Sequence, residues 1–161
     1  MKYLKLQQDI LKACDRQWKK PITHDYFYSE TEDEVIVLIS SAYAMIVPKA
    51  EWWLDLKAIF GEVAGRFDRI KDMIRKAEDV SEVLEDPHVT EEIERNGKVM
   101  KLKKLTLGSE VIWLDEALLK YLDLPNTGFK GSNGKSPVLA YEGTQLVGLF
   151  LPVHRNKKEE E

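Results

Sequence analysis

The sequence predicts an α+β domain whose strands form antiparallel sheets, and three observations support this. Runs of aromatic and β-branched residues separated by short polar turns indicate antiparallel meanders. Several segments have the apolar spacing of a helix. A helix followed by strands occurs near both ends of the chain, in 3–49 and more clearly in 110–155. We therefore expect one domain, 1–155, built from two helix-plus-β-meander halves, with a helical insertion at 61–86 and a charged tail at 156–161.

The amino-acid composition argues against several functional classes of protein. The 161 residues carry a net charge of −4, which argues against indiscriminate nucleic-acid binding but leaves room for a local basic face. Cys14 is the single cysteine, so an internal disulfide and a cysteine-based zinc cluster are excluded. No apolar run reaches membrane-spanning length, and the first residues lack the apolar core of a signal peptide. We expect a cytoplasmic protein without membrane contact.

Residues 3–18 have helical apolar spacing, and Pro21 ends the predicted helix. Cys14 falls on the apolar side, where we expect a packed thiol. The polar side carries four cations on one face, interrupted only by Asp9. A solvated helix face is the simplest interpretation, and a stripe that contacts phosphate groups is the functional alternative. The four cations are Lys5, Lys12, Arg16 and Lys19.

A β-meander is predicted next, with strands at 25–29, 35–40 and 43–47. The middle run, VIVLI, is apolar throughout, which is typical of a strand buried on both faces.

Residues 50–60 are predicted to form a helix that contains Trp52 and Trp53. Adjacent helical positions point about 100° apart, so we expect one tryptophan in the core and the other at a boundary. Simple packing of both is the plainer interpretation. The alternative is an exposed aromatic anchor for a partner protein.

Residues 61–80 form the clearest amphipathic helix of the sequence. Its apolar stripe can pack on the core, or it can dock on a partner protein. Acidic residues between its basic ones argue against membrane binding. The stripe consists of Val63, Phe67, Ile70, Ile74 and Ala77.

Residues 89–95 and 98–107 flank Asn96-Gly97, the preferred pair for a type I′ hairpin turn. Lysines crowd the second arm and glutamates the first. Cross-strand charge pairing is the simpler interpretation, and an anion site is the alternative.

The last third predicts a strand at 111–113, a helix at 115–122 capped by Asp115, a glycine-rich loop at 124–136, and strands at 138–141 and 146–153.

Motifs for catalysis are missing. The loop GSNGKS resembles the end of a phosphate-binding P-loop, but Phe129 occupies the position of the required first glycine, and Pro137 with a strand-like run follows where a helix is needed. The histidines at 24, 88 and 154 lack metal-ligand spacing, and no serine has a nucleophile-elbow context. We expect a non-catalytic protein without metal or cofactor, although an enzyme site formed only in three dimensions stays open.

Four stretches resemble the processivity clamps of DNA replication, as in the bacterial sliding clamp, the beta subunit of DNA polymerase III. VIWLDEALLKYLDL is similar to that family's strand-then-helix segment. SPVLAYEG and LVGLFLPVHR are similar to its closing hairpin, and IVPKAEWWLDLKAIF to the stretch where a strand enters Val-Pro and a helix begins.

The resemblance implies a non-catalytic protein, with a phage or mobile-element origin as one option, that acts in DNA replication with double-stranded DNA or replication proteins as partners. Its paired helices would offer Lys5, Lys12, Arg16, Lys19 and Lys120 to the duplex, although Asp115 and Glu116 weaken the second helix. One domain is present where a clamp ring needs six, so a ring would require a homo-oligomer. The alternative is a protein-interaction module that kept the fold without encircling DNA and contacts its partner through Trp52 and Trp53.

Overall fold

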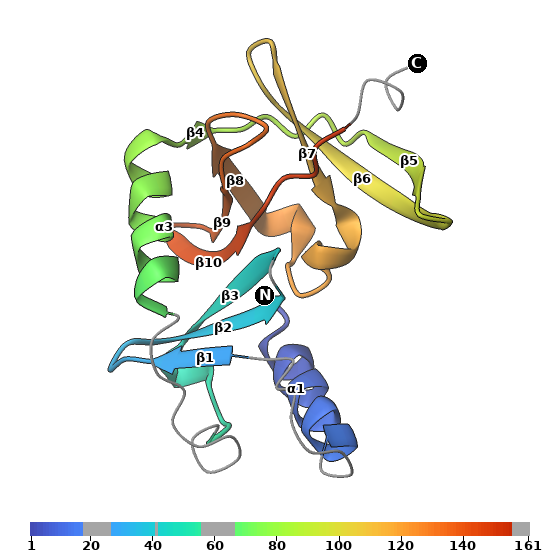
Figure 1. Cartoon of the computed structure of the whole chain (residues 1–161). Helices are drawn as coiled ribbons and strands as arrows, with labels where there is room; N and C mark the ends of the chain where they lie inside the picture. The colour runs from blue at the N-terminus through green and yellow to red at the C-terminus, as the bar shows by residue number, and fades with distance from the viewer. Residues whose placement is uncertain (18–26, 41, 56–66, 156–161) are drawn as a thin grey trace.

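The computed structural model describes residues 1–17, 27–40, 42–55 and 67–155 (Figure 1). The fold is mixed α+β with mainly antiparallel sheets, as the sequence predicted. Among the described residues, no helix is both long and apolar enough to cross a membrane.

The helical elements are α1 (Tyr3–Gln17), η1 (Lys49–Glu51), α3 (Phe67–Val80), η2 (Glu116–Leu119) and η3 (Leu124–Asn126), of which the three labelled η are short 3-10 turns. The strands are β1 (Phe27–Glu30), β2 (Glu34–Ser40), β3 (Tyr43–Pro48), β4 (Glu82–Val83), β5 (Thr90–Arg95), β6 (Lys98–Leu107), β7 (Glu110–Asp115), β8 (Thr127–Gly131), β9 (Val138–Glu142) and β10 (Gln145–Phe150).

The first predicted meander and the strands predicted at 138–141 and 146–153 join into one sheet, whereas the strand predicted at 111–113 belongs to another sheet and β8 forms within the predicted loop at 124–136. The order of the joined sheet is β1-β2-β3-β10-β9-β8-β4, and the strands β5-β6-β7 form a second sheet of three. The junction is the antiparallel pair β3 and β10, in which Met45 lies opposite Gly148 and Tyr43 opposite Phe150. Strands from both ends of the chain are therefore direct neighbours.

The large sheet is buried on both faces, which confirms the prediction for the VIVLI run. Val35 and Val37 of β2 point into a cluster that also contains Leu6 and Ile10 of α1. Ile36, between them, points to the opposite face. Because side chains alternate along a strand, α1 and α3 cover opposite faces of the sheet.

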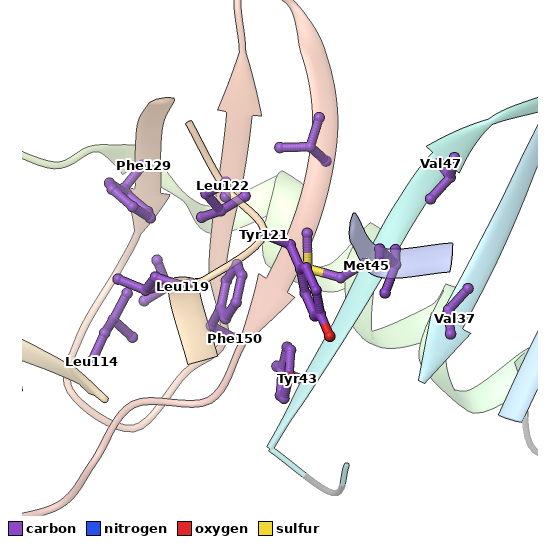
Figure 2. Close-up of a cluster of buried hydrophobic side chains, with 14 of the residues drawn as sticks. Val37, Tyr43, Met45, Val47, Leu114, Leu119, Tyr121, Leu122, Phe129 and Phe150 are labelled. Atoms are coloured by element: carbon purple, nitrogen blue, oxygen red, sulfur yellow. The ribbon is translucent and has the colours of Figure 1, made fainter. Parts of the chain in front are cut away.

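The main cluster lies between the large sheet, α1, the three-stranded sheet and the η2 segment (Figure 2). Tyr43 and Phe150 stack there with ring centroids 5.8 Å apart. Tyr121, which follows η2, is fully buried among them and donates a hydrogen bond of 2.9 Å from its hydroxyl to Asp9 of α1. The second cluster is built by α3, whose Ile70, Ile74 and Ala77 are buried as the apolar stripe predicted. Val63 lies outside the described residues, as does the side chain of Phe67.

The β5–β6 hairpin extends away from the rest of the molecule (Figure 1). Asn96 and Gly97 have φ of 54° and 71°, which confirms the predicted type I′ turn because that turn needs positive φ at both positions. Two lysines of β6 form ion pairs outside the hairpin, which differs from the predicted cross-strand pairing, although Lys101 does lie opposite Glu92 in the ladder. Lys101 lies 3.2 Å from Glu116 and Lys103 lies 2.7 Å from Asp86.

The predicted helix at 50–60 is wrong for 50–55. Only η1 is helical; Trp52 after it is extended, and residues 52–55 form neither helix nor strand. Two contacts hold this segment in place, because the indole N–H of Trp52 donates to the carbonyl of Leu54 at 2.6 Å and the backbone N–H of Trp53 donates to the Gln7 side chain at 2.7 Å. Residues 56–60 lie outside the described residues. The prediction that one tryptophan lies in the core is confirmed for Trp52, which is 8% exposed, whereas Trp53, 60% exposed, lies further in solvent than the predicted boundary position.

The predicted helix at 115–122 is also wrong, because only the short turn η2 forms. Asp115 does cap it, with Oδ1 accepting from the N–H of Ala117 at 3.0 Å. Leu119, Tyr121 and Leu122 are all buried. A regular helix would point residue 121 about 200° away from residue 119, so the tighter turn and the chain after it allow all three to enter the core.

Candidate interaction surfaces around the first helix

A buried glutamine ties α1 to the segment after η1. Gln7 is 2% exposed. Its Nε2 donates to the carbonyl oxygens of Glu51 at 2.9 Å and Tyr3 at 3.2 Å, and its Oε1 accepts from the N–H of Trp53 at 2.7 Å. A buried amide of this kind is stable because both of its ends are satisfied. It fixes the backbone of Trp53 against the helix.

Three large apolar side chains stay in solvent around this anchor. Leu4 is 58%, Leu11 46% and Trp53 60% exposed. Leu4 precedes Gln7 by three residues and Leu11 follows it by four, so both leucines lie one helical turn from the anchor. We call Leu4, Leu11 and Trp53 the apolar patch. The helical spacing predicts that both leucines lie on the packed side of the helix with Leu6 and Ile10. In the structure Leu6 and Ile10 are buried, whereas Leu4 and Leu11 are exposed.

The predicted basic stripe is described in part. Lys5 and Lys12 are exposed on the same face of α1, seven residues apart. Only the backbone of Arg16 is described, and Lys19 lies outside the described residues. The Lys5 Nζ lies 4.0 Å from Asp9 Oδ2, so Asp9 offsets part of the charge of the stripe.

Lys120, the predicted cation of the second half, joins the same side of the molecule. Its ammonium lies 4.9 Å from the ring centroid of Tyr121, and the hydroxyl of that ring bonds Asp9. Lys2 binds the same turn, with its Nζ donating to the Lys120 carbonyl at 3.2 Å and its backbone N–H donating to the Tyr121 carbonyl at 2.8 Å. We call Lys2, Lys5, Lys12 and Lys120 the basic face.

A shallow cleft of about 360 Å³ lies beside Lys2 and Lys120. Glu116 and Asp123 also line it, so its charges balance. Because its positive and negative charges balance, this cleft has no preference for an anion. We therefore treat the lysines of the basic face as contacts on an open surface and not as part of a pocket.

The two tryptophans that were predicted to contact a partner differ in exposure. Trp52 is buried and bonds Leu54, so it supports the fold, whereas Trp53 belongs to the apolar patch.

The shifted titrations have structural causes. Burial, followed by the charges of Glu142 and Glu51, raises the pKa of Tyr3. Burial, followed by the charge of Glu78, raises the pKa of Tyr141. Within the described ranges, no group of three or more acidic, histidine or cysteine side chains is placed to hold a metal ion.

Comparison with known proteins adds no relative: no protein-family model, curated protein or solved structure matched this chain.

Proposed function

We propose that this protein is a non-catalytic interaction module that binds a partner protein through the apolar patch. The observation that supports it is the exposure of Leu4, Leu11 and Trp53 around one satisfied buried anchor. Single exposed apolar residues are ordinary, but a group of them on a rigid element is typical of a binding surface. Tryptophan is also among the residues that contribute most to binding energy at interfaces.

The partner should present an apolar strip with acidic residues at its side. Lys5 and Lys12 are displaced from Leu4 and Leu11 by roughly a quarter-turn of the helix. A partner seated on the leucines would therefore meet two exposed ammonium groups at one edge. Such rim charges raise association rates and help to select the partner.

Capture from extract of the native host tests this proposal. We expect a protein to be retained by the wild-type chain after nuclease treatment and lost with Trp53→Ala or Leu11→Gln, because either change removes a large part of the contact. Val99→Gln is the matched control, since Val99 is 69% exposed on the distant hairpin. Retention that is equal for all four proteins, or that depends on nucleic acid, would refute the proposal.

The second candidate function is binding of double-stranded DNA, and the observation that favours it is the basic face. Lys5 and Lys120 come from opposite ends of the chain and lie on either side of the Asp9–Tyr121 hydrogen bond. Contacts from lysines to phosphates are independent of sequence, which is what a protein that slides along DNA needs.

This second candidate includes the clamp-like interpretation of the fold. Both α1 and η2 contribute to the main cluster, as the paired helices of a clamp domain would. The short second helix and the single continuous sheet differ from the two-half arrangement that the resemblance implies. A ring would still need six copies, so the mass of the protein in solution bears directly on this candidate.

Duplex binding measured at several salt concentrations tests the second candidate. Affinity should fall steeply with salt, and the double substitution Lys5→Glu, Lys12→Glu should abolish binding. Neutral substitutions at both positions should reduce the salt slope by about two, roughly one for each lost phosphate contact. The control is Lys71→Glu, an exposed lysine of α3. A monomer that shows no duplex binding at low salt would exclude the clamp role.

A further inference from the structure

A separate cleft of about 370 Å³ lies at the end of the described chain, between β7, the β8–β9 loop and residues 153–155. The C-terminal segment runs beside β7 (Figure 1), where the N–H of Val153 donates to the carbonyl of Trp113 at 2.8 Å. The volume is within the range of small-molecule sites, roughly 300–1,000 Å³. The side chains that matter for binding are Trp113, Asn133, Lys135, Val153, His154 and Arg155.

The loop side of this cleft has a defined shape. The Asn133 Oδ1 accepts from the backbone N–H groups of Lys135 at 2.8 Å and Ser136 at 2.9 Å, which closes the loop on itself. A Cβ added at Gly134 would lie 3.5 Å from the carbonyl oxygen of Val111, so the loop backbone packs close to β7. Lys135 is therefore presented from an ordered turn, although it is exposed.

The opposite wall is aromatic and cationic. The guanidinium of Arg155 lies 4.8 Å from the ring centroid of Trp113 and also pairs with Glu91 at 2.5 Å. The ammonium of Lys104 lies 5.9 Å from the same ring. Stacking and pairing hold the arginine in place over the indole, so this wall offers a ligand the flat guanidinium plane and the apolar side chain of Val153.

The charges of the cleft favour an anion. Lys135 makes no ion pair with any described residue, and His154, which lines the same cleft, is exposed like Lys135. Glu110 is the single carboxylate that lines the cleft in the described part of the chain, whereas Glu91, outside the lining, already pairs with Arg155. An ammonium and an imidazole can both donate to phosphate oxygens, which are strong acceptors.

We propose that this cleft binds a nucleotide, with the phosphate at Lys135 and His154 and the base against Val153 and the guanidinium plane of Arg155, which stacks on Trp113. A bare phosphate would leave this wall unused, whereas a flat base would cover it. The geometry differs from a P-loop, because β9 and not a helix follows the loop. The ligand can be a free mononucleotide or the terminal nucleotide of a single strand, since both present the same chemistry.

Titration calorimetry on the full chain separates these sources, with adenosine monophosphate, a 5′-phosphorylated oligothymidine and inorganic phosphate as probes. We expect one of the first two to bind more tightly than inorganic phosphate. Lys135→Gln and His154→Gln should each weaken that binding about tenfold, the loss expected for one charge-assisted hydrogen bond. Lys71→Gln, which alters an exposed lysine on α3, should leave it unchanged.

Three outcomes would overturn the proposal. The first is a dissociation constant above about 1 mM for both nucleotide probes. The second is inorganic phosphate binding as tightly as the nucleotides, and the third is equal weakening by Lys71→Gln. The site is independent of the apolar patch and the basic face, so the tests of the proposed function do not decide this one.

Discussion

At the scale of single residues, Lys103 is the one charged residue that is buried in the described part of the chain. It is 7% exposed and lies 2.7 Å from Asp86, whose carboxylate also accepts from the N–H of His88 at 2.9 Å. Burial acts to raise the pKa of Asp86, but the hydrogen bonds from Lys103 and His88 outweigh it and leave that pKa below its ordinary value. The folded state therefore favours the ionised carboxylate.

We expect Asp86→Asn to lower the free energy of unfolding at pH 7 by about 1 kcal/mol, because Lys103 loses a charged partner that is itself in contact with solvent. A lowered pKa stabilises the fold above the unfolded value of about 3.9 and loses its effect as pH falls through the folded pKa. The difference between wild type and variant should therefore shrink below about pH 4. Urea unfolding at pH 7 and pH 3 measures it.

Asp72→Asn is the control for this prediction. Asp72 also has a lowered pKa, caused first by its hydrogen bond with Lys76 and then by that with Arg75, but the pair lies on the open surface of α3. Ion pairs of that kind contribute little to stability. An equal loss of stability in the two variants would mean that the burial of Lys103 is unimportant.

Gly148 lies at the register shift of β10. A Cβ there would lie 2.7 Å from Cε2 of Phe150, a fully buried ring that stacks on Tyr43. Gly148→Ala should destabilise the fold by about 1–3 kcal/mol, as overpacking of a core does. Gly128→Ala, where a Cβ meets nothing within 4 Å, should cause no such loss in the same denaturation experiment.

At the scale of elements, the sequence predicted what depends on local pattern. The first helix, the meander, the Asn96-Gly97 turn and the α3 stripe each follow from periodicity or from turn chemistry within a few residues. The two helices that were wrong depend on distant contacts. The segment after η1 is held against α1 by Gln7, which lies 46 residues before Trp53, and the η2 turn is shaped by the core that it enters.

The candidate surfaces also divide into features set by local sequence pattern and features set by distant contacts. The shared exposed face of Lys5 and Lys12 could be predicted because it follows from the helical period, whereas Lys120 was named only through the family resemblance. The apolar patch could not be predicted, because Leu4 and Leu11 fit the apolar period that places Leu6 and Ile10 in the core. The cleft at Trp113 could not be predicted either, since residues 113, 135 and 154 come together only because the β8–β9 loop and the C-terminal segment pack beside β7.

A substitution at Gln7 tests how the segment after η1 is held against α1. Gln7→Met keeps a similar shape but leaves the N–H of Trp53 and the carbonyl of Glu51 without their partner. We expect a loss of about 1–3 kcal/mol and faster amide exchange at Trp53. Gln8→Met, on the exposed side of the same helix, is the control. Unchanged exchange at Trp53 in the Gln7 variant would show that another contact holds the segment.

At the scale of the whole molecule, the two meanders are parts of one sheet and one core. The main cluster takes Val37 and Met45 from the first half and Leu114, Tyr121 and Phe150 from the second (Figure 2). The β3–β10 ladder joins them through backbone hydrogen bonds. Neither half buries its apolar face without the other, so the order of elements repeated in the sequence does not make two independent units.

This arrangement predicts a single cooperative transition. Native-state hydrogen exchange should give the amides of Met45 in β3 and Leu139 in β9 similar opening free energies, both near the global value, because opening either half exposes the shared core. The tip of the β5–β6 hairpin, around Asn96, supplies the low-protection comparison, since its packing is mostly on itself. If β2 and β3 opened together at a free energy well below that of β9, the halves would be separate folding units. The large sheet would then consist of two separately folding units that pair through β3 and β10, which is the arrangement that a clamp-like ancestry implies.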